Sequence, residues 1–347
     1  MIIQTRKILR FLHSNIQSFF IPTPVFIRII PTDRCNLRCK YCFQMNPNSP
    51  IMGKKDFNKY LKKAHELGTS IISFLGGEPM TWPHIYHAIK ECNKKNMITQ
   101  MTTNTTLLSK KTLNKLGKAG LDILEVSADS ILDQGQSKKN LLVKNKLSPM
   151  LLDVRKKYGV YIKVHAVTTR TNINQIEKLI DFAHKLNFPI SLGYIIPPLL
   201  PSQKWGGDYL IFTKKDYSKL KQFIQMIKRK KQEGYNIIDS NSYFEGIFDY
   251  IEKKSRWDCK HSKKYSGIII APDGRLRSCT KLMDYLNYSF LDLTPSLIKE
   301  VREKIKKKID SCNPKCYSNC AYAAYYYSQH KIEFMKNNFF PSIKNIY

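Results

Sequence analysis

From residue 25 to residue 196 the sequence alternates short apolar runs with amphipathic segments, and this alternation limits the fold more than any other feature. Runs such as VFIRII (25–30), LDILEVSAD (121–129) and VYIKVHAVTT (160–169) have the length and β-branched content of strands. Between them, DFNKYLKKAHEL (56–67) has helical spacing, and SKKTLNKLGKAG (109–120) opens on a Ser N-cap and closes on Gly. Six strand–helix repeats with short links predict a parallel α/β fold, either a barrel or a doubly wound sheet.

The regular alternation ends at the segment PPLLPSQKWGG (197–207), which is rich in Pro and Gly. A long helix near 213–232 and a bridging helix near 242–254 are expected next. Five of the nine cysteines then fall between residues 259 and 320, around a hairpin pattern in GIIIAPDGRLRSC. We therefore expect four parts: an N-terminal basic amphipathic segment at 1–24, a core at 25–200, a helical bridge at 201–255, and a small α+β domain with a C-terminal helix at 256–347.

Three further cysteines, Cys35, Cys39 and Cys42, lie close together in TDRCNLRCKYCF (32–43), after the first expected strand. Three thiolates are too few for a closed zinc site, which takes four ligands. The N-terminus is not a clean secretory signal, so we expect a cytoplasmic, reducing location in which clustered cysteines bind metal. A [4Fe–4S] cluster held by three cysteines leaves one iron open to a small molecule. A zinc site completed by His13 is the alternative.

The spacing C-x3-C-x2-C, with aromatic Tyr41 before the last cysteine, resembles the signature of the radical S-adenosylmethionine (SAM) superfamily. The resemblance implies an incomplete (β/α)6 TIM-like barrel as the core. It implies that SAM chelates the open iron, and that an electron from the reduced cluster cleaves SAM to methionine and a 5′-deoxyadenosyl radical. That radical abstracts hydrogen from the substrate, so the chain is expected to be an oxidoreductase-type enzyme.

Motifs at the ends of later expected strands fit the same family. GGEP (76–79), TTN (102–104) and SAD (127–129) all lie at carboxyl ends of parallel strands, the face where barrel active sites form. Taken alone, GGEP is equally typical of an ordinary turn between a strand and a helix. Arg170 is either a ligand of an anionic group or a solvated side chain. The resemblance implies SAM-binding roles for Tyr41, Gly76, Gly77, Glu78, Pro79, Asn104, Ser127, Asp129 and Arg170. It identifies no catalytic acid or base.

The C-terminal cysteines form a second pattern. Cys259, Gly274 and Cys279 are spaced C-x14-G-x4-C, and CNPKCYSNC adds Cys312, Cys316 and Cys320. This resembles the auxiliary-cluster region of radical SAM enzymes that is called the SPASM or twitch domain. A full SPASM region binds two further clusters, whereas five cysteines suffice for one. The resemblance therefore implies one auxiliary [4Fe–4S] cluster on four of these five cysteines, with a zinc ribbon as the alternative.

The formal net charge of +31 raises the question of an anionic partner. The excess is mostly Lys scattered along the expected helices, so we do not expect nucleic-acid binding. The first twenty residues combine Arg6, Lys7 and Arg10 with apolar side chains. Such a helix either lies on an anionic membrane as a peripheral contact or packs across the mouth or bottom of the barrel.

The sequence thus predicts a radical SAM enzyme that modifies a peptide or protein, or a small molecule. It would take electrons from a donor such as ferredoxin or flavodoxin. The alternatives are an enzyme that acts on lipid or isoprenoid substrates at the membrane surface and an RNA-modifying enzyme. A non-catalytic iron–sulfur or zinc-binding module is the alternative from another class.

Overall fold

The computed structural model describes residues 5–130, 147–198, 205–254, 268–310, 316–319 and 322. The strands form one nine-stranded sheet in the order β6-β5-β4-β3-β2-β1-β7-β8-β9. Their bounds are β1 Phe26–Ile29, β2 Ile71–Phe74, β3 Ile98–Thr103, β4 Ile123–Ser127, β5 Tyr161–Thr168, β6 Ile190–Tyr194, β7 Ile268–Ile270, β8 Arg275–Arg277 and β9 Tyr285–Ser289.

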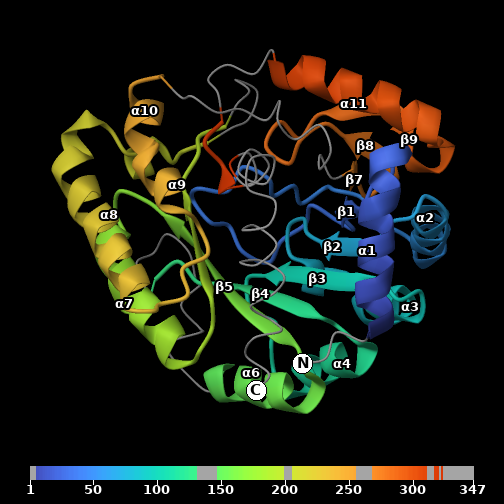
Figure 1. Cartoon of the computed structure of the whole chain (residues 1–347), viewed down its shortest axis with the longest axis horizontal. Coiled ribbons are helices and arrows are strands. Elements are labelled where there is room, and N and C mark those ends of the chain that lie inside the picture. Colours follow the sequence, from blue (N-terminus) through green and yellow to red (C-terminus); the bar gives the residue numbers. More distant parts are fainter. Residues whose placement is uncertain are drawn as a thin grey trace.

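Helices cover the outside of this curved sheet (Figure 1). Those that follow the first five strands are α2 Lys54–Glu66, α3 Ile85–Lys94, α4 Lys110–Ala119, α6 Leu147–Tyr158 and α7 Ile173–Lys185. The others are α1 Thr5–Phe20, α8 Tyr217–Gln232, α9 Asn241–Glu245, α10 Ile247–Ile251 and α11 Pro295–Asp310. The bridging helix expected near 242–254 is thus two short helices, α9 and α10.

Strands β1 to β6 pair with one another in parallel, and the sheet does not close. The expected incomplete (β/α)6 barrel is confirmed, and the doubly wound alternative is wrong, because the strands follow one another around the sheet in chain order. In β5, residues alternate between partly exposed and buried positions. The buried set packs against the surrounding helices, and the other set faces the inside of the barrel. We call this inner space the lumen.

The C-terminal region continues the same sheet. Strand β7 pairs in parallel with β1, and β7, β8 and β9 then form an antiparallel meander. The hairpin expected around residues 272–274 is confirmed, and Gly274 takes the left-handed conformation at its turn, with φ of 83°. The C-terminal strands are therefore joined to the first barrel strand edge to edge.

Helix α1 lies at the amino-terminal edge of the sheet. Lys7, which is 2% exposed, donates to both carboxylate oxygens of Asp122 at 2.8 and 2.7 Å, just before β4. Phe11 packs with Val25, at the start of β1, and with Ile71 of β2. Of the two packing sites left open by the sequence, the structure places α1 at the bottom of the barrel. Among the described residues, no helix combines the length and apolar character needed to cross a membrane.

Candidate functional site

The loop that follows β1 carries the three clustered cysteines and is fastened at its base. The backbone N–H of Asp33 donates to the Ser49 hydroxyl at 3.0 Å, and Arg34 Nε donates to the Ser49 carbonyl at 2.7 Å. Ser49 is fully buried. Residues 33 and 49, sixteen positions apart, are thereby held together, which fixes the two ends of the loop between them. We call residues 30–53 the cluster loop.

The Asn104 side chain, just past the end of β3, contacts this loop near Cys35. Asn104 donates through Nδ2 to the Cys35 sulfur at 3.6 Å and to Asn36 Oδ1 at 2.9 Å. Burial raises the pKa of the Cys35 thiol. Cys39 and Cys42 are joined by a backbone hydrogen bond of 2.9 Å. The loop therefore presents its thiols at the carboxyl edge of the barrel.

Tyr41 connects the cluster loop to the end of β4. Its hydroxyl donates to the Asp129 carboxylate, which also accepts from the backbone N–H of Val167 at 3.0 Å. Asn172 donates to the carbonyls of Asp129 and Val167 at 2.9 and 2.8 Å. Burial, together with the Asp129 carboxylate, raises the pKa of Tyr41 well above its usual value. The aromatic residue of the motif thus fixes the loop over β4 and β5.

The two glycines of GGEP pack directly against the cluster loop. A β-carbon on Gly76 would lie 2.3 Å from the carbonyl oxygen of Thr32, and one on Gly77 would lie 2.0 Å from that of Arg34. Gly76 also has φ of 134°. These positions require glycine because the backbone of the cluster loop approaches so closely. Their predicted contact with SAM remains a prediction.

Glu78 is 1% exposed and ties β2 to β3. One carboxylate oxygen accepts from Thr103 Oγ1 at 2.7 Å and from Met80 N at 3.1 Å, and the other accepts from Asn104 N at 2.7 Å. A buried carboxylate needs such donors. Glu78 therefore positions the end of β3, and with it the Asn104 side chain, in addition to any contact with SAM.

The remaining predicted SAM ligands lie around the same edge. Pro79, which is buried, begins a 3-10 turn, and Ser127 is the buried last residue of β4. Arg170 follows β5 and donates to Asp216 at 2.9 Å, with 41% of its side chain exposed. The sequence left two interpretations of Arg170, and the structure adds a third, which is an ion pair with Asp216. Its contact with an anionic ligand remains a prediction.

The donor set at this edge fits an iron–sulfur cluster and a bound small molecule. No three His, Cys, Asp or Glu side chains of the described residues converge as the ligands of a single ion do. A four-iron cluster is larger than one ion, and its ligands surround a volume. Thr105, just past TTN, has φ of 70°, and its buried hydroxyl has no hydrogen-bond partner among the described residues. Strain in a β-branched residue beside an unsatisfied hydroxyl is typical of a ligand site.

Of the five C-terminal cysteines, the structure describes Cys279 and Cys316. Cys279 lies just after β8, and its sulfur accepts from Lys281 N at 3.2 Å. Burial raises the pKa of the Cys316 thiol to about 11, and the nearby Cys279 sulfur adds to this shift. Two thiols that influence each other suit a common cluster. Cys259, Cys312 and Cys320 lie outside the described residues, so their role as ligands remains a prediction.

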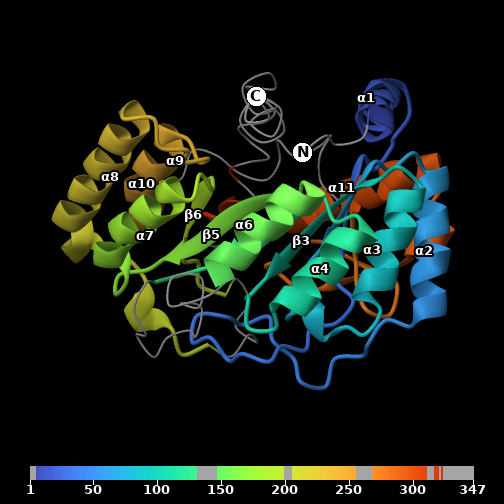
Figure 2. The same ribbon diagram turned by 90° about the horizontal axis from the view of Figure 1, so that it is seen from below.

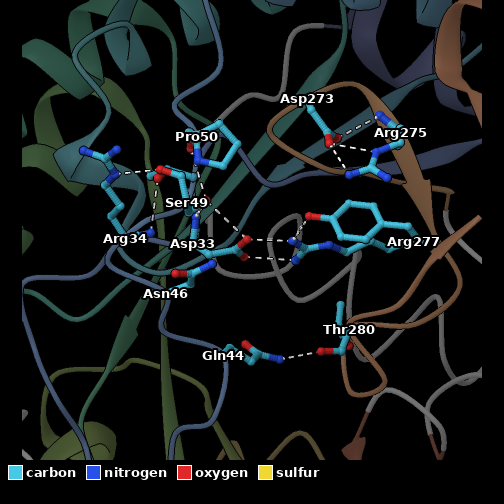
Figure 3. Close-up of polar contacts among 12 residues, drawn as sticks. Asp33, Arg34, Gln44, Asn46, Ser49, Pro50, Asp273, Arg275, Arg277 and Thr280 are labelled. Atoms are coloured by element: carbon cyan, nitrogen blue, oxygen red, sulfur yellow. Dashed lines mark hydrogen bonds and ion pairs between the residues drawn. The ribbon is translucent and has the colours of Figure 1, made fainter. Parts of the chain in front are cut away.

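Two contacts join the two cysteine regions (Figure 3). Arg277 of β8 donates to both oxygens of Asp33 at 2.9 and 2.6 Å, and both side chains are buried. Gln44 of the cluster loop donates to the carbonyl of Thr280 at 2.6 Å. No pattern in the sequence pairs these residues, because each is an ordinary polar side chain and 236 to 244 positions separate the partners.

The lumen contains a polar row that sequence reasoning missed. Thr102 of β3, Glu125 of β4 and Lys163 of β5 are neighbours in strand register. Thr102 donates to Glu125 at 3.1 Å, and Lys163 forms an ion pair with it. His165 pairs in register with Ser127, and burial lowers its pKa. The available signal was the strand YIKVHAVT, in which polar side chains occupy two of the alternate positions that face the lumen. We call Thr102, Glu125, Lys163 and His165 the lumen row.

Comparison with known proteins points to one family. The sequence profile of the radical SAM superfamily matches residues 29–205. A GTP 3′,8-cyclase of Clostridium botulinum (strain Langeland) is 27% identical over 300 residues, which span 82% of this chain and 90% of that protein. An S-adenosylmethionine-dependent nucleotide dehydratase of Flammeovirga pacifica is 26% identical over 64% of this chain and 78% of its own length.

Two solved structures share the fold. The structure of anSMEcpe with bound AdoMet has a TM-score of 0.62 and 19% identity, and the match covers 92% of this chain and 98% of that one. Streptococcus suis SuiB bound to the precursor peptide SuiA has a TM-score of 0.62 and 18% identity, over 87% and 70% of the two chains. At these identities the likeness concerns the fold alone.

Proposed function

Because the chain belongs to the radical SAM superfamily and is a SAM-dependent enzyme with a [4Fe–4S] cluster, we propose that it abstracts hydrogen from a small polar substrate held in the barrel lumen. When bound, the cluster and SAM supply the 5′-deoxyadenosyl radical. We propose Cys35, Cys39 and Cys42 as the cluster ligands. Asn104 and Tyr41 then position the loop that bears them, through the contacts to Cys35 and to Asp129.

The lumen row supports a polar substrate. Glu125 and Lys163 lie one layer of side chains inside the strand ends where the predicted SAM ligands gather, and His165 lies in the same layer as Ser127. Charged side chains in a half-closed lumen are costly unless paired or used, and their donors and acceptors recognise polar groups. The sequence relatives named for GTP and for nucleotides favour a nucleotide-like molecule over a lipid or isoprenoid.

The C-terminal region supports an auxiliary cluster of the SPASM or twitch type. Cys279 and Cys316 would be two of its ligands, completed by two of Cys259, Cys312 and Cys320. Free thiols and oxygen-sensitive clusters suit a reducing compartment. We propose a ferredoxin or flavodoxin as electron donor, since a net charge of +31 favours association with an acidic carrier protein.

The first experiment tests the cluster ligands. We expect the anaerobically reconstituted protein, reduced with dithionite, to form 5′-deoxyadenosine from SAM. Replacement of Cys35, Cys39 and Cys42 with Ala should abolish this product and leave C-terminal iron in place. Cys92→Ala is the matched control, because Cys92 is a buried thiol of α3 far from this edge. Product formation by the triple variant would show that the ligands are misassigned.

The second experiment tests the substrate class. Nucleoside triphosphates, peptides and isoprenoid phosphates are compared for stimulation of 5′-deoxyadenosine formation. We expect stimulation by nucleotides, and expect Lys163→Met to reduce it about tenfold, as loss of one charge-assisted contact does. Cleavage of SAM without substrate should be unaffected in that variant. Stimulation by a peptide or an isoprenoid alone would overturn the proposed substrate class.

A further inference from the structure

Helix α1 has two faces, and its polar face points into the protein. Besides the buried ion pair of Lys7 with Asp122, Arg10 donates to the carbonyl of Thr69 at 2.8 Å, and Ser14 donates to the carbonyl of Gly68 at 2.6 Å. A surface helix ordinarily turns its apolar side chains inward and its charges outward. In α1 this arrangement is largely reversed.

The opposite face of α1 is an apolar stripe. Leu9, Leu12, Ile16 and Phe20 recur at intervals of three and four residues, which places them on one side of the helix. Their exposed fractions are 59%, 43%, 60% and 83%, and the following Ile21 is 42% exposed. We call these five residues the α1 stripe. They are half of the ten large apolar side chains that are exposed among the described residues, so exposure of this kind is concentrated here.

The stripe cannot turn inward. Asp122 accepts from Lys7 and also from the backbone N–H of Thr99 at 2.8 Å, and it is buried. Rotation of α1 about its axis would remove Lys7 and leave a buried carboxylate without its counter-ion. The loss of that counter-ion is strongly destabilising. The inner face therefore fixes the rotation of the helix, and the stripe remains on the surface.

We propose that the α1 stripe docks on an anionic lipid bilayer. The stripe is a single convex row along one helix, the shape that enters the headgroup region. Arg6 and His13 are exposed along one of its sides, and α1 contains no acidic residue. On neighbouring α2, His65 contacts Arg10, and Lys95 at the end of α3 and Glu66 lie near it. A helix whose apolar side chains are flanked by cations binds anionic lipid through both apolar burial and charge attraction. Neutral lipid provides only the apolar burial.

The position of α1 determines how the enzyme would be oriented on the bilayer. In Figure 2, α1 lies at the top of the view and the blue loop that follows β1 lies at the bottom, on opposite sides of the molecule. Contacts agree, since Lys7 meets the amino end of β4, whereas Asn104 and Asp129 lie past carboxyl ends. Docking through the stripe therefore leaves the cluster loop and the lumen facing water. This orientation holds a polar substrate site away from the lipid.

Vesicle co-sedimentation of the full reconstituted protein tests the proposal. Vesicles contain equal parts phosphatidylglycerol and phosphatidylcholine, or phosphatidylcholine alone. We expect binding to the anionic vesicles only, and an affinity at least about tenfold lower after Leu9→Gln, Ile16→Gln and Phe20→Gln combined. Glutamine retains helix propensity. The matched control combines Leu152→Gln and Leu291→Gln, two exposed leucines outside α1 and outside the cluster loop, and should bind as the unaltered protein does.

Circular dichroism and 5′-deoxyadenosine formation verify that both combined variants are folded, because neither set of residues lies at the cluster edge. Equal sedimentation of the stripe variant and the unaltered protein would overturn the proposal. So would absence of vesicle binding, or equal binding to phosphatidylcholine alone. Light scattering supplies the remaining outcome: a dimer that the stripe variant disrupts, without vesicle binding, would assign the stripe to a second copy of the chain.

Discussion

Arg277 of β8 and Asp33 of the cluster loop form a buried, bidentate ion pair between segments that are remote in sequence. The guanidinium is 3% and the carboxylate 5% exposed. Asp33 lies two residues before Cys35, and Arg277 lies two residues before Cys279. Tyr285 adds a hydrogen bond to the same guanidinium at 3.1 Å. The pair therefore connects the backbone that carries the first proposed cluster ligand with the backbone that carries an auxiliary one.

Replacement of Arg277 should leave the buried Asp33 carboxylate without its counter-ion. We expect Arg277→Met to lower the free energy of unfolding by about 3–5 kcal/mol, because a buried Asp33 would lose its counter-ion. Urea denaturation of the anaerobic protein measures this loss. Arg275→Met is the matched control: Arg275 pairs with Asp273 two positions away in an exposed setting, and its loss should cost less than about 1 kcal/mol. Figure 3 shows both pairs.

A double variant separates the ion pair from packing. With Asp33→Leu and Arg277→Met together, neither charge is left buried, so the combined cost should be clearly smaller than the sum of the two single costs. Additive costs would mean that the two side chains act independently. Electron paramagnetic resonance of each variant would show whether loss of the pair also reduces occupancy of the N-terminal cluster.

Gly77 should tolerate no side chain. A β-carbon there would lie 2.0 Å from the Arg34 carbonyl oxygen, which is backbone and cannot rotate away. Gly77→Ala must displace the cluster loop, and we expect a loss of about 1–3 kcal/mol in unfolding free energy together with reduced iron binding. Gly206→Ala is the control, since no atom lies within 4 Å of a β-carbon at that position. Equal behaviour of the two variants would contradict the close packing of the loop on GGEP.

Iron analysis tests the number of clusters. One open and one auxiliary [4Fe–4S] cluster predict about eight irons per chain after anaerobic reconstitution. About four irons with one zinc would assign a zinc ribbon to the C-terminal region. About twelve irons would mean that a ligand other than cysteine serves a third cluster. Substitution of Cys279 by Ala should remove only the iron of the auxiliary cluster and leave SAM cleavage measurable.

Local patterns in the sequence were sufficient to predict a parallel α/β fold, and the family resemblance narrowed it to the barrel. The strand at 25–30 and the helix at 56–67 agree with β1 and α2 to within a few residues, because apolar periodicity is a local signal. The capping expected at Ser109 and Gly120 is present. The parallel pairing of β7 with β1 was not predicted. Parallel pairing of two strands about 240 residues apart leaves no mark in either segment.

The site was predicted less completely than the fold. Motifs identified Cys35, Glu78 and Asp129, but their hydrogen-bond partners could not be read from spacing. No sequence motif includes His165, and the structure places it in the lumen row. A polar residue in a buried strand is ambiguous until its face is known. The inward orientation of the polar face of α1 could not be predicted from the sequence for a similar reason. Periodicity shows that a helix has two faces and does not show which one the protein covers.

The lumen row should make the free energy of unfolding depend on pH in the acidic range. Burial pushes the pKa of Glu125 upward, but Lys163, His165 and the hydrogen bonds of Lys163 and Thr102 outweigh it and lower the pKa to about 2. In the unfolded chain the carboxyl returns to an ordinary pKa of about 4.3. The unfolded state therefore binds more protons between these two values, so this stabilisation is complete above about pH 5 and declines as the pH falls toward 2.

The variant Glu125→Gln removes that titration. We expect it to be less stable than the unaltered chain near neutral pH, by on the order of 3 kcal/mol. The deficit should narrow as the pH falls from about 5 toward 2, because the unaltered chain loses the charge that the variant never had. Urea denaturation of the cluster-free chain across this range measures it, so that loss of iron in acid does not contribute. Glu66→Gln, at an exposed position on α2, should follow the unaltered chain at every pH. A constant deficit for Glu125→Gln over the whole range would show that folding does not lower the pKa of Glu125.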